Sequence, residues 1–214
     1  MNKLQIGWVG LGNMGTPIVK NLLKADFRVN VYNRTKEKEA ELITAGATSA
    51  EDLPQLAQKS DVVITMVSDD EAVKQIYTGA DGLLSHANPG KLAIDMSTVS
   101  PSTSRYLAQS CQERGMDFID APVSGSVKPA QDGTLIIMVG GAEQAFKKAT
   151  PIFDVIGKLS IHLGENGAGS SAKLAINYLL GLNLQGLAET VLFAKENGIK
   201  TEDMLNIINE GACG

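Results

Sequence analysis

Two polar residues four positions apart, Lys173 and Asn177, interrupt an otherwise apolar segment late in the chain. This spacing places both side chains on one face of a helix. A lysine is almost never fully buried without a partner, so Lys173 is expected to line a cleft, where its ammonium group can give a proton to a carbonyl oxygen. The alternative interpretation is a solvated lysine in the first turn of that helix.

A second candidate is the turn formed by Ser124, Gly125 and Ser126, which follows a predicted strand. Two hydroxyl groups and several closely spaced N–H groups suit a carboxylate ligand. The order G-x-S-x-G of a nucleophile elbow is absent, so the serines are not expected to act as nucleophiles. The same residues are also typical of a loop selected only for its turn propensity.

A glycine-rich hexapeptide near the N-terminus fits the pattern G-x-G-x-x-G and lies between a predicted strand and a predicted helix. In that setting the glycines allow a tight turn, close approach of a pyrophosphate and close packing of helix on strand. A turn that is merely rich in glycine is the weaker alternative. The predicted pyrophosphate-binding residues are Gly10, Leu11, Gly12, Asn13, Met14 and Gly15.

The end of the second predicted strand indicates which dinucleotide is bound. NAD sites usually carry an acidic residue there, whereas this chain has Asn33, Arg34 and Thr35. Arg34 can bind a 2′-phosphate, and its neighbours can add hydrogen bonds. NADP is therefore predicted as the cofactor in preference to NAD, with a surface arginine at the start of a helix as the alternative.

Composition excludes several other classes of protein. The 19 basic and 24 acidic residues give a net charge of −5, which argues against a nucleic-acid or anionic-membrane partner. No apolar run reaches the length of about 18 residues that a membrane span needs. Cys111 and Cys213 lack C-x-x-C spacing, and His86 and His162 are the only histidines, so no metal site is predicted. A reducing cytoplasm is the simplest compartment.

These candidate residues need a scaffold, and the hydrophobic pattern predicts one. Apolar strands alternate with amphipathic helices through residue 163, which is typical of a doubly wound, mostly parallel Rossmann-type sheet. Strands are expected at residues 4–10, 28–32, 61–67, 91–96, 117–123, 134–140 and 159–163, and helices at 14–25, 35–45, 69–77, 101–114 and 142–155.

A glycine- and serine-rich stretch at residues 164–171 predicts a domain boundary. The expected division is a nucleotide-binding domain at residues 1–163 and a helical segment at residues 164–214. The second part is expected to contain a long helix at residues 172–197 and a short one at 201–209. The long helix is apolar almost all round, which is typical of a helix buried between partners.

The motifs G-L-G-N-M-G, D-A-P-V-S-G, G-T-L-I-I-M-V-G-G and K-L-A-I-N occur in that order. In this combination the chain resembles the β-hydroxyacid dehydrogenase family, which includes 3-hydroxyisobutyrate dehydrogenase. The segments N-R-T and V-S-G-S-V-K-P-A-Q-D-G-T-L most resemble its glyoxylate/succinic semialdehyde reductase branch.

The resemblance implies NADP-linked interconversion of a short carboxylated aldehyde and its hydroxy acid. It implies that Lys173 is the catalytic acid/base with Asn177 in support, and that the turn at residues 124–126 binds the substrate carboxylate. It also implies cofactor contacts on the adenosine side and, through Thr98, near the nicotinamide. The residues implied on the adenosine side are Met66, Val67 and Ser68. 3-Hydroxyisobutyrate and tartronate semialdehyde remain alternative substrates.

Members of this family continue into an all-helical domain that closes the cleft and contains a K-D-x-x-x-A-type segment. These 214 residues lack that segment, so an incomplete all-α domain is expected after the Rossmann-type domain. Two expectations follow. The first is self-association through the apolar long helix, or else instability. The second is an alternative function, namely a non-catalytic NADP-binding module or an inactive fragment of a longer enzyme.

Overall fold

The computed structural model describes residues 4–86 and 89–211. Within them, nine strands form one sheet in the order β3-β2-β1-β4-β5-β6-β8-β7, and β9 pairs with β8. All pairs from β3 to β6 are parallel, whereas β8 is antiparallel to β6 and to β7. The predicted doubly wound, mostly parallel sheet is therefore confirmed. The strands are β1 (Gln5–Val9), β2 (Arg28–Tyr32), β3 (Thr48–Ser49), β4 (Val62–Thr65), β5 (Leu92–Asp95), β6 (Asp117–Asp120), β7 (Val123–Ser124), β8 (Leu135–Gly141) and β9 (Gly157–His162).

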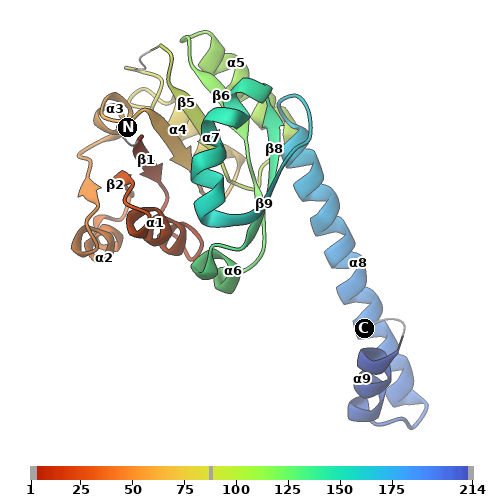
Figure 1. Cartoon of the computed structure of the whole chain (residues 1–214). Helices are drawn as coiled ribbons and strands as arrows, with labels where there is room; N and C mark the ends of the chain where they lie inside the picture. Colours follow the sequence, from red (N-terminus) through yellow and green to blue (C-terminus); the bar gives the residue numbers. More distant parts are fainter. Residues whose placement is uncertain (1–3, 87–88, 212–214) are drawn as a thin grey trace. The chain divides into compact units, whose positions relative to one another are not determined.

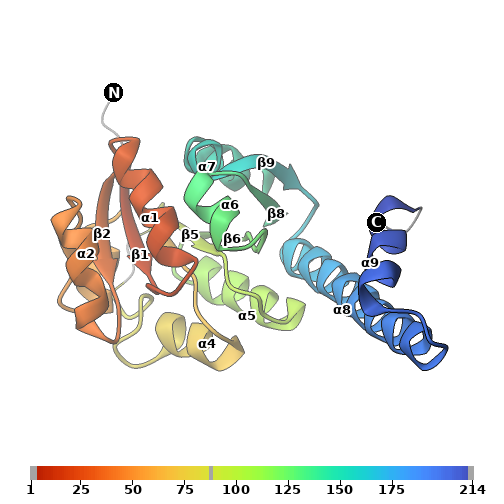
Figure 2. The same cartoon turned by 90° about the horizontal axis from the view of Figure 1, so that it is seen from below.

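Helices cover both faces of this sheet, as Figure 2 shows for α1, α6 and α7 on one side and α4 and α5 on the other. Ile18 of α1 and Phe153 of α7 belong to one buried apolar cluster. Val73 of α4 and Leu107 of α5 belong to the other. The helical elements are α1 (Gly15–Lys24), the 3₁₀ helix η1 (Lys36–Glu39), α2 (Ala40–Thr44), α3 (Leu53–Gln58), α4 (Asp70–Thr78), α5 (Pro101–Gln112), α6 (Val127–Asp132) and α7 (Glu143–Ile156).

Two predicted elements are divided in the structure. The helix predicted at residues 35–45 consists of η1 followed by the short helix α2. The strand predicted at residues 117–123 breaks at Ala121 and Pro122, because a proline has no N–H group for the ladder. After the break, β7 pairs with β8 instead of continuing β6. Three short elements, β3, α3 and α6, have no counterpart in the prediction.

The chain divides into two compact units, residues 1–173 and 174–214. The helix α8 (Ala168–Glu196) begins in the first unit and continues as one uninterrupted helix in the second (Figure 1). It starts four residues before its predicted position at 172, so the first unit includes its first turn. The domain boundary expected between residues 163 and 164 therefore precedes the division between the units.

The second unit contains the rest of α8 and the helix α9 (Thr201–Glu210), with Gly198 at φ 80° in the turn between them. Large apolar side chains of α8 are exposed, including Tyr178 and Phe193 at 71% and 70%. Self-association through this helix stays a prediction. None of the helices in the described part of the chain is long and apolar enough to cross a membrane.

Candidate active site

A cleft of about 1130 Å³ opens in the first unit where β1, β2, β4 and β5 end. Ligands of parallel sheets bind at these carboxyl ends. The cleft brings together most of the residues singled out in the sequence. Those that line it are Gly10, Leu11, Gly12, Asn13, Met14, Gly15, Asn33, Arg34, Thr35, Met66, Val67, Ser68, Thr98, Gly125 and Lys173.

The glycine-rich turn joins β1 to α1 and has little room for side chains. Gly10 has φ 101°, and a Cβ atom there would lie 2.2 Å from the Met66 carbonyl oxygen. A Cβ atom at Gly15 would lie 2.2 Å from the carbonyl oxygen of Gly10, so this position fixes how closely α1 packs on β1. Apart from its two neighbours in the chain, no described residue has an atom within 4 Å of a Cβ atom at Gly12, so this position faces open space. The turn therefore leaves a cradle that fits a pyrophosphate.

The N-terminus of α1 also suits an anion. No side chain caps it, and its first turn contains no acidic residue. By contrast α3, α4 and α5 are capped by Asp52, Asp69 and Ser100, whose side chains accept hydrogen bonds from backbone N–H groups. The Thr16 N–H already donates to the Gly12 carbonyl oxygen at 3.2 Å, and Pro17 has no N–H group. The N–H groups of Met14 and Gly15 are therefore the ones that can bind a phosphate at this helix start.

Asn33 connects the glycine-rich turn to the end of β2. Its Oδ1 accepts a 3.0 Å hydrogen bond from the Leu11 N–H, and its Nδ2 donates to the Thr35 carbonyl oxygen at 2.8 Å. Its own N–H donates to Oε1 of the buried Glu39 at 2.8 Å. Because both ends of its side chain are used within the protein, Asn33 mainly positions the two loops.

The basic residues after β2 fall into two groups. Lys36 lies 3.1 Å from a carboxylate oxygen of Glu39 and also donates to the Ala50 carbonyl oxygen at 2.6 Å. Arg34 and Lys38 line the cleft and are exposed, and neither has an ion pair within the part of the chain that the structure describes. These two cations are available to an anionic ligand. Lys38 was missed because the sequence predicted a regular helix here instead of the 3₁₀ turn of η1.

A buried polar cluster lies at the ends of β4 and β5. The hydroxyl groups of Thr65 and Ser97 each donate to Asp95 Oδ1 at 2.7 Å. Asp95 Oδ2 is buried without a partner, and burial raises the pKa of this carboxyl to about 6, although the two hydroxyl groups oppose the shift. Ser97, which sequence reasoning missed, lines the cleft and accepts a hydrogen bond from the Val67 N–H at 2.9 Å.

The turn at residues 124–126, which is predicted to bind a carboxylate, lies only partly in the cleft. Gly125 lines it, whereas Ser124 and Ser126 do not. Ser124 ends β7, and Ser126 precedes α6 without capping it. Neither serine side chain makes a hydrogen bond to another described residue of the chain, so their hydroxyl groups remain available.

Lys173 reaches the cleft from the second turn of α8, and its half-buried position lowers the pKa of the ammonium group through desolvation. The start of this helix is held by Asp120, whose two carboxylate oxygens accept from the N–H groups of Gly167 at 2.7 Å and Ser170 at 2.9 Å. Asn177 follows one turn later, is exposed and belongs to the second unit.

Other reactive groups do not assemble into a site. The thiol of Cys111 is buried, and burial raises its pKa to about 12. Cys213 lies outside the described residues. Within residues 4–86 and 89–211, no group of three or more His, Cys, Asp or Glu residues could hold a metal ion.

The strand order, the glycine-rich turn and the cleft at the strand ends define a dinucleotide-binding domain of the Rossmann class. Residues 5–164 match the family model of the NAD binding domain of 6-phosphogluconate dehydrogenase. Residues 167–214 match the model of the NAD-binding region of NADP-dependent 3-hydroxyisobutyrate dehydrogenase. The chain belongs to the β-hydroxyacid dehydrogenase family of NAD(P)-dependent enzymes that act on CH–OH groups.

Individual relatives agree with this assignment. 2-(Hydroxymethyl)glutarate dehydrogenase of Eubacterium barkeri is 39% identical over 98% of this chain and 69% of its own length. Glyoxylate/succinic semialdehyde reductase 1 of Arabidopsis thaliana is 38% identical over 98% of this chain and 72% of its own length. The structure of Mycobacterium tuberculosis 3-hydroxyisobutyrate dehydrogenase with L-serine superposes with a TM-score of 0.91 at 32% identity, covering 100% of this chain and 72% of that one.

Proposed function

We propose that this chain uses NADPH to reduce a short aldehyde that bears a carboxylate, such as glyoxylate or succinic semialdehyde, and catalyses the reverse oxidation of the hydroxy acid. One observation carries the proposal: Gly12, Arg34, Gly125 and Lys173 line the same cleft. A dinucleotide site, a 2′-phosphate site, a carboxylate site and a proton donor are thereby combined in one cavity. The similarity to a glyoxylate/succinic semialdehyde reductase supports this substrate class.

The proposed contacts follow the lining of the cleft. The turn at residues 10–15 and the uncapped start of α1 hold the pyrophosphate. Met66, Val67 and Ser68 border the adenosine side, and Thr98 borders the nicotinamide. Gly125 brings the turn at residues 124–126 to the cleft, and the N–H groups and hydroxyls of this turn are proposed to bind the substrate carboxylate, although Ser124 and Ser126 lie outside the lining.

Lys173 is the proposed acid/base. The bound dinucleotide supplies or accepts the hydride. In the reduction, the ammonium group of Lys173 donates a proton to the carbonyl oxygen as negative charge develops on it. Desolvation lowers the pKa of Lys173, which makes the ammonium group a stronger acid than a solvated lysine. Asn177 shares a helix face with Lys173 and is proposed to support it.

A panel of substrates tests this function. The purified chain is mixed with NADPH and, in turn, with glyoxylate, succinic semialdehyde and tartronate semialdehyde, and the decrease in NADPH absorbance is followed. 3-Hydroxyisobutyrate with NADP⁺ tests the oxidation. We expect turnover with at least one carboxylated aldehyde and none with the corresponding aldehyde that lacks the carboxylate. Calorimetric binding of NADPH without turnover on any member would instead favour the non-catalytic binding module.

The proposed preference of the chain for NADP over NAD gives a separate prediction. Arg34→Ala is expected to weaken NADPH binding by about 1.5 to 3 kcal/mol, roughly 10-fold to 150-fold, because it removes a charge-assisted hydrogen bond to the 2′-phosphate. NADH, which lacks this phosphate, should bind the variant and the unchanged chain equally well. Dissociation constants from fluorescence titration of both dinucleotides give the comparison.

Arg28→Ala is the matched control for this variant, because Arg28 is an exposed arginine at the opposite end of the same strand β2. It should leave both dissociation constants unchanged. If Arg34→Ala weakens NADPH and NADH by the same factor, or weakens neither, the arginine does not select the phosphate and the preference for NADP is wrong.

A further inference from the structure

Two loops that line the cleft are cross-linked to each other by hydrogen bonds. One joins β4 to α4 and contributes Met66, Val67 and Ser68, and the other joins β5 to α5 and contributes Met96, Ser97 and Thr98. The first cross-link lies inside the cleft wall, where Ser97 Oγ accepts from the Val67 N–H at 2.9 Å. Ser97 is fixed in turn by the buried Asp95, to which it donates at 2.7 Å.

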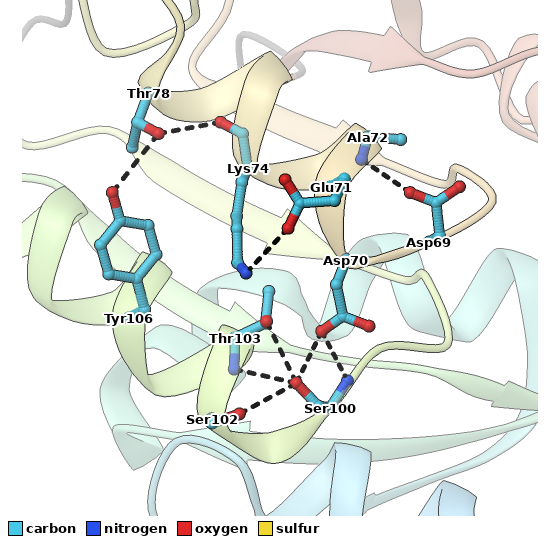
Figure 3. A network of polar contacts seen from close by, with 10 residues as sticks. All are labelled: Asp69, Asp70, Glu71, Ala72, Lys74, Thr78, Ser100, Ser102, Thr103 and Tyr106. Atoms are coloured by element: carbon cyan, nitrogen blue, oxygen red, sulfur yellow. Dashed lines mark hydrogen bonds and ion pairs between the residues drawn. The ribbon is translucent and has the colours of Figure 1, made fainter.

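The second cross-link lies outside the cleft and depends on Asp70, in the first turn of α4. Asp70 Oδ1 accepts from Ser100 twice, from its hydroxyl at 2.6 Å and from its N–H at 3.1 Å. Figure 3 shows that Ser100 is the centre of this network, with Ser102 and Thr103 also bonded to its hydroxyl. The hydroxyl groups of Ser100 and Thr103 lower the pKa of Asp70, so it is ionised at neutral pH.

The two acidic neighbours of Asp70 do not reach the other loop. Asp69 caps its own helix by accepting from the Ala72 N–H at 2.8 Å. Glu71 is exposed and pairs with Lys74 on the same helix at 3.3 Å. Of three consecutive acidic residues, only Asp70 connects α4 to the start of α5 (Figure 3). Asp70 itself does not line the cleft.

We propose that Asp70 is a positioning residue for the dinucleotide: through Ser100 it holds the loops at residues 66–69 and 96–100 together as one preformed wall. The inference rests on the proposed placement of the adenosine side against the first loop and the nicotinamide against the second. A ligand that spans both loops gains affinity when their spacing is set before binding. A ligand that contacts only one loop gains nothing from the cross-link.

This difference provides the test. Affinities of the unchanged chain and of Asp70→Ala are measured by titration with NADPH, which spans both loops, and with 2′,5′-ADP, which is the adenosine half alone. We expect Asp70→Ala to weaken NADPH roughly fivefold to tenfold, as loss of the hydrogen bonds to Ser100 implies, and to leave 2′,5′-ADP close to its original affinity. The pair NADH and 5′-ADP is measured in parallel, and the dinucleotide that the unchanged chain binds more tightly is used for the comparison.

Two further variants test whether the effect comes from the hydrogen bonds of Asp70 to Ser100. Asp70→Asn keeps an oxygen that accepts from Ser100 and should restore most of the NADPH affinity. Glu71→Gln changes the adjacent carboxylate, which does not contact the other loop, and should bind both ligands as the unchanged chain does. If Asp70→Ala fails to fold, Ser100→Ala removes the hydroxyl half of the cross-link from the α5 side while the Ser100 N–H still reaches Asp70. This variant must show a selective loss of NADPH affinity in the same direction.

Unchanged NADPH affinity in Asp70→Ala, or an equal loss for NADPH and 2′,5′-ADP, overturns the inference, because a local or general destabilisation of the cleft weakens both ligands alike. These titrations do not depend on turnover. An inactive chain that still binds the dinucleotide would refute the proposed reaction while leaving the role of Asp70 open to this measurement. A chain that binds neither dinucleotide overturns both.

Discussion

Lys173→Ala should lower the turnover number for aldehyde reduction by about 100-fold to 10,000-fold, the usual contribution of a positioned general acid. NADPH affinity should stay close to that of the unchanged chain, because the glycine-rich turn and Arg34 lie on other loops of the cleft. Lys173→Arg keeps the positive charge but should remain nearly inactive, since a guanidinium group does not release its proton near neutral pH. Steady-state kinetics and NADPH titration of the same preparations separate the two effects.

The pH dependence of reduction provides a second readout for Lys173. The protonated amine is the active form, so activity is present below the pKa of Lys173 and is lost as the pH rises through it. Desolvation lowers that pKa, which moves the loss of activity to a lower pH than a solvated lysine would give. This alkaline limb should disappear from the residual activity of Lys173→Ala.

Lys195→Ala is the matched control, because Lys195 is an exposed lysine in the last turn of the same helix α8. It should keep both the turnover number and the pH profile. A Lys173→Ala variant with full activity would show that another group donates the proton.

The sequence was most informative where a single local pattern determines the structure. Each of the strands β4 and β5 begins with three apolar residues and is buried along its whole length, which is typical of a sheet covered on both faces. The helix predicted to start at residue 101 does start there, because proline is favoured in the first turn of a helix and the preceding Ser100 hydroxyl caps it. The glycine-rich turn was found for the same reason, since its spacing and its position after a strand are both local features.

Features that depend on distant residues were not predictable in this way. The pattern near Gly169 and Ser170 predicted a domain boundary outside any helix, because neither residue favours a helix. In the structure both residues are helical. Asp120, which lies 47 positions before Gly167, accepts hydrogen bonds from the N–H groups of Gly167 and Ser170 and so stabilises the start of α8. Likewise, the sequence could place Ser124 and Gly125 in one turn, but which of them faces the cleft depends on how β7 pairs with β8.

The contact between Asp120 and α8 leads to the second large expected effect. Asp120 is fully buried at the end of β6, and each of its carboxylate oxygens accepts from one N–H group at the start of α8. Asp120→Ala leaves both N–H groups without an acceptor, at a cost of about 1 to 3 kcal/mol each. It also removes a negative charge from the N-terminus of a helix, where that charge is stabilising. The free energy of unfolding should therefore fall by roughly 3 kcal/mol or more, measured by urea denaturation.

Asp117→Ala is the matched control for stability. Asp117 lies on the same strand β6, is partly exposed and forms an ion pair with Lys148 at 2.6 Å. Surface pairs of this kind contribute only about 0 to 1 kcal/mol. A denaturation midpoint for Asp120→Ala equal to that of Asp117→Ala would show that the start of α8 does not need the carboxylate.

The same substitution should affect catalysis, because Asp120 connects two parts of the proposed site. Four residues after Asp120, the chain reaches Ser124 and the carboxylate turn, and three residues after its partner Ser170, α8 presents Lys173 to the cleft. One buried carboxylate thereby sets the position of the proton donor relative to the substrate turn. In buffer without urea, under conditions in which Asp120→Ala is folded, its turnover number should fall. Its NADPH affinity should be retained, because the proposed dinucleotide contacts lie on other loops. Loss of NADPH affinity in parallel with turnover would instead indicate that the whole first unit had loosened.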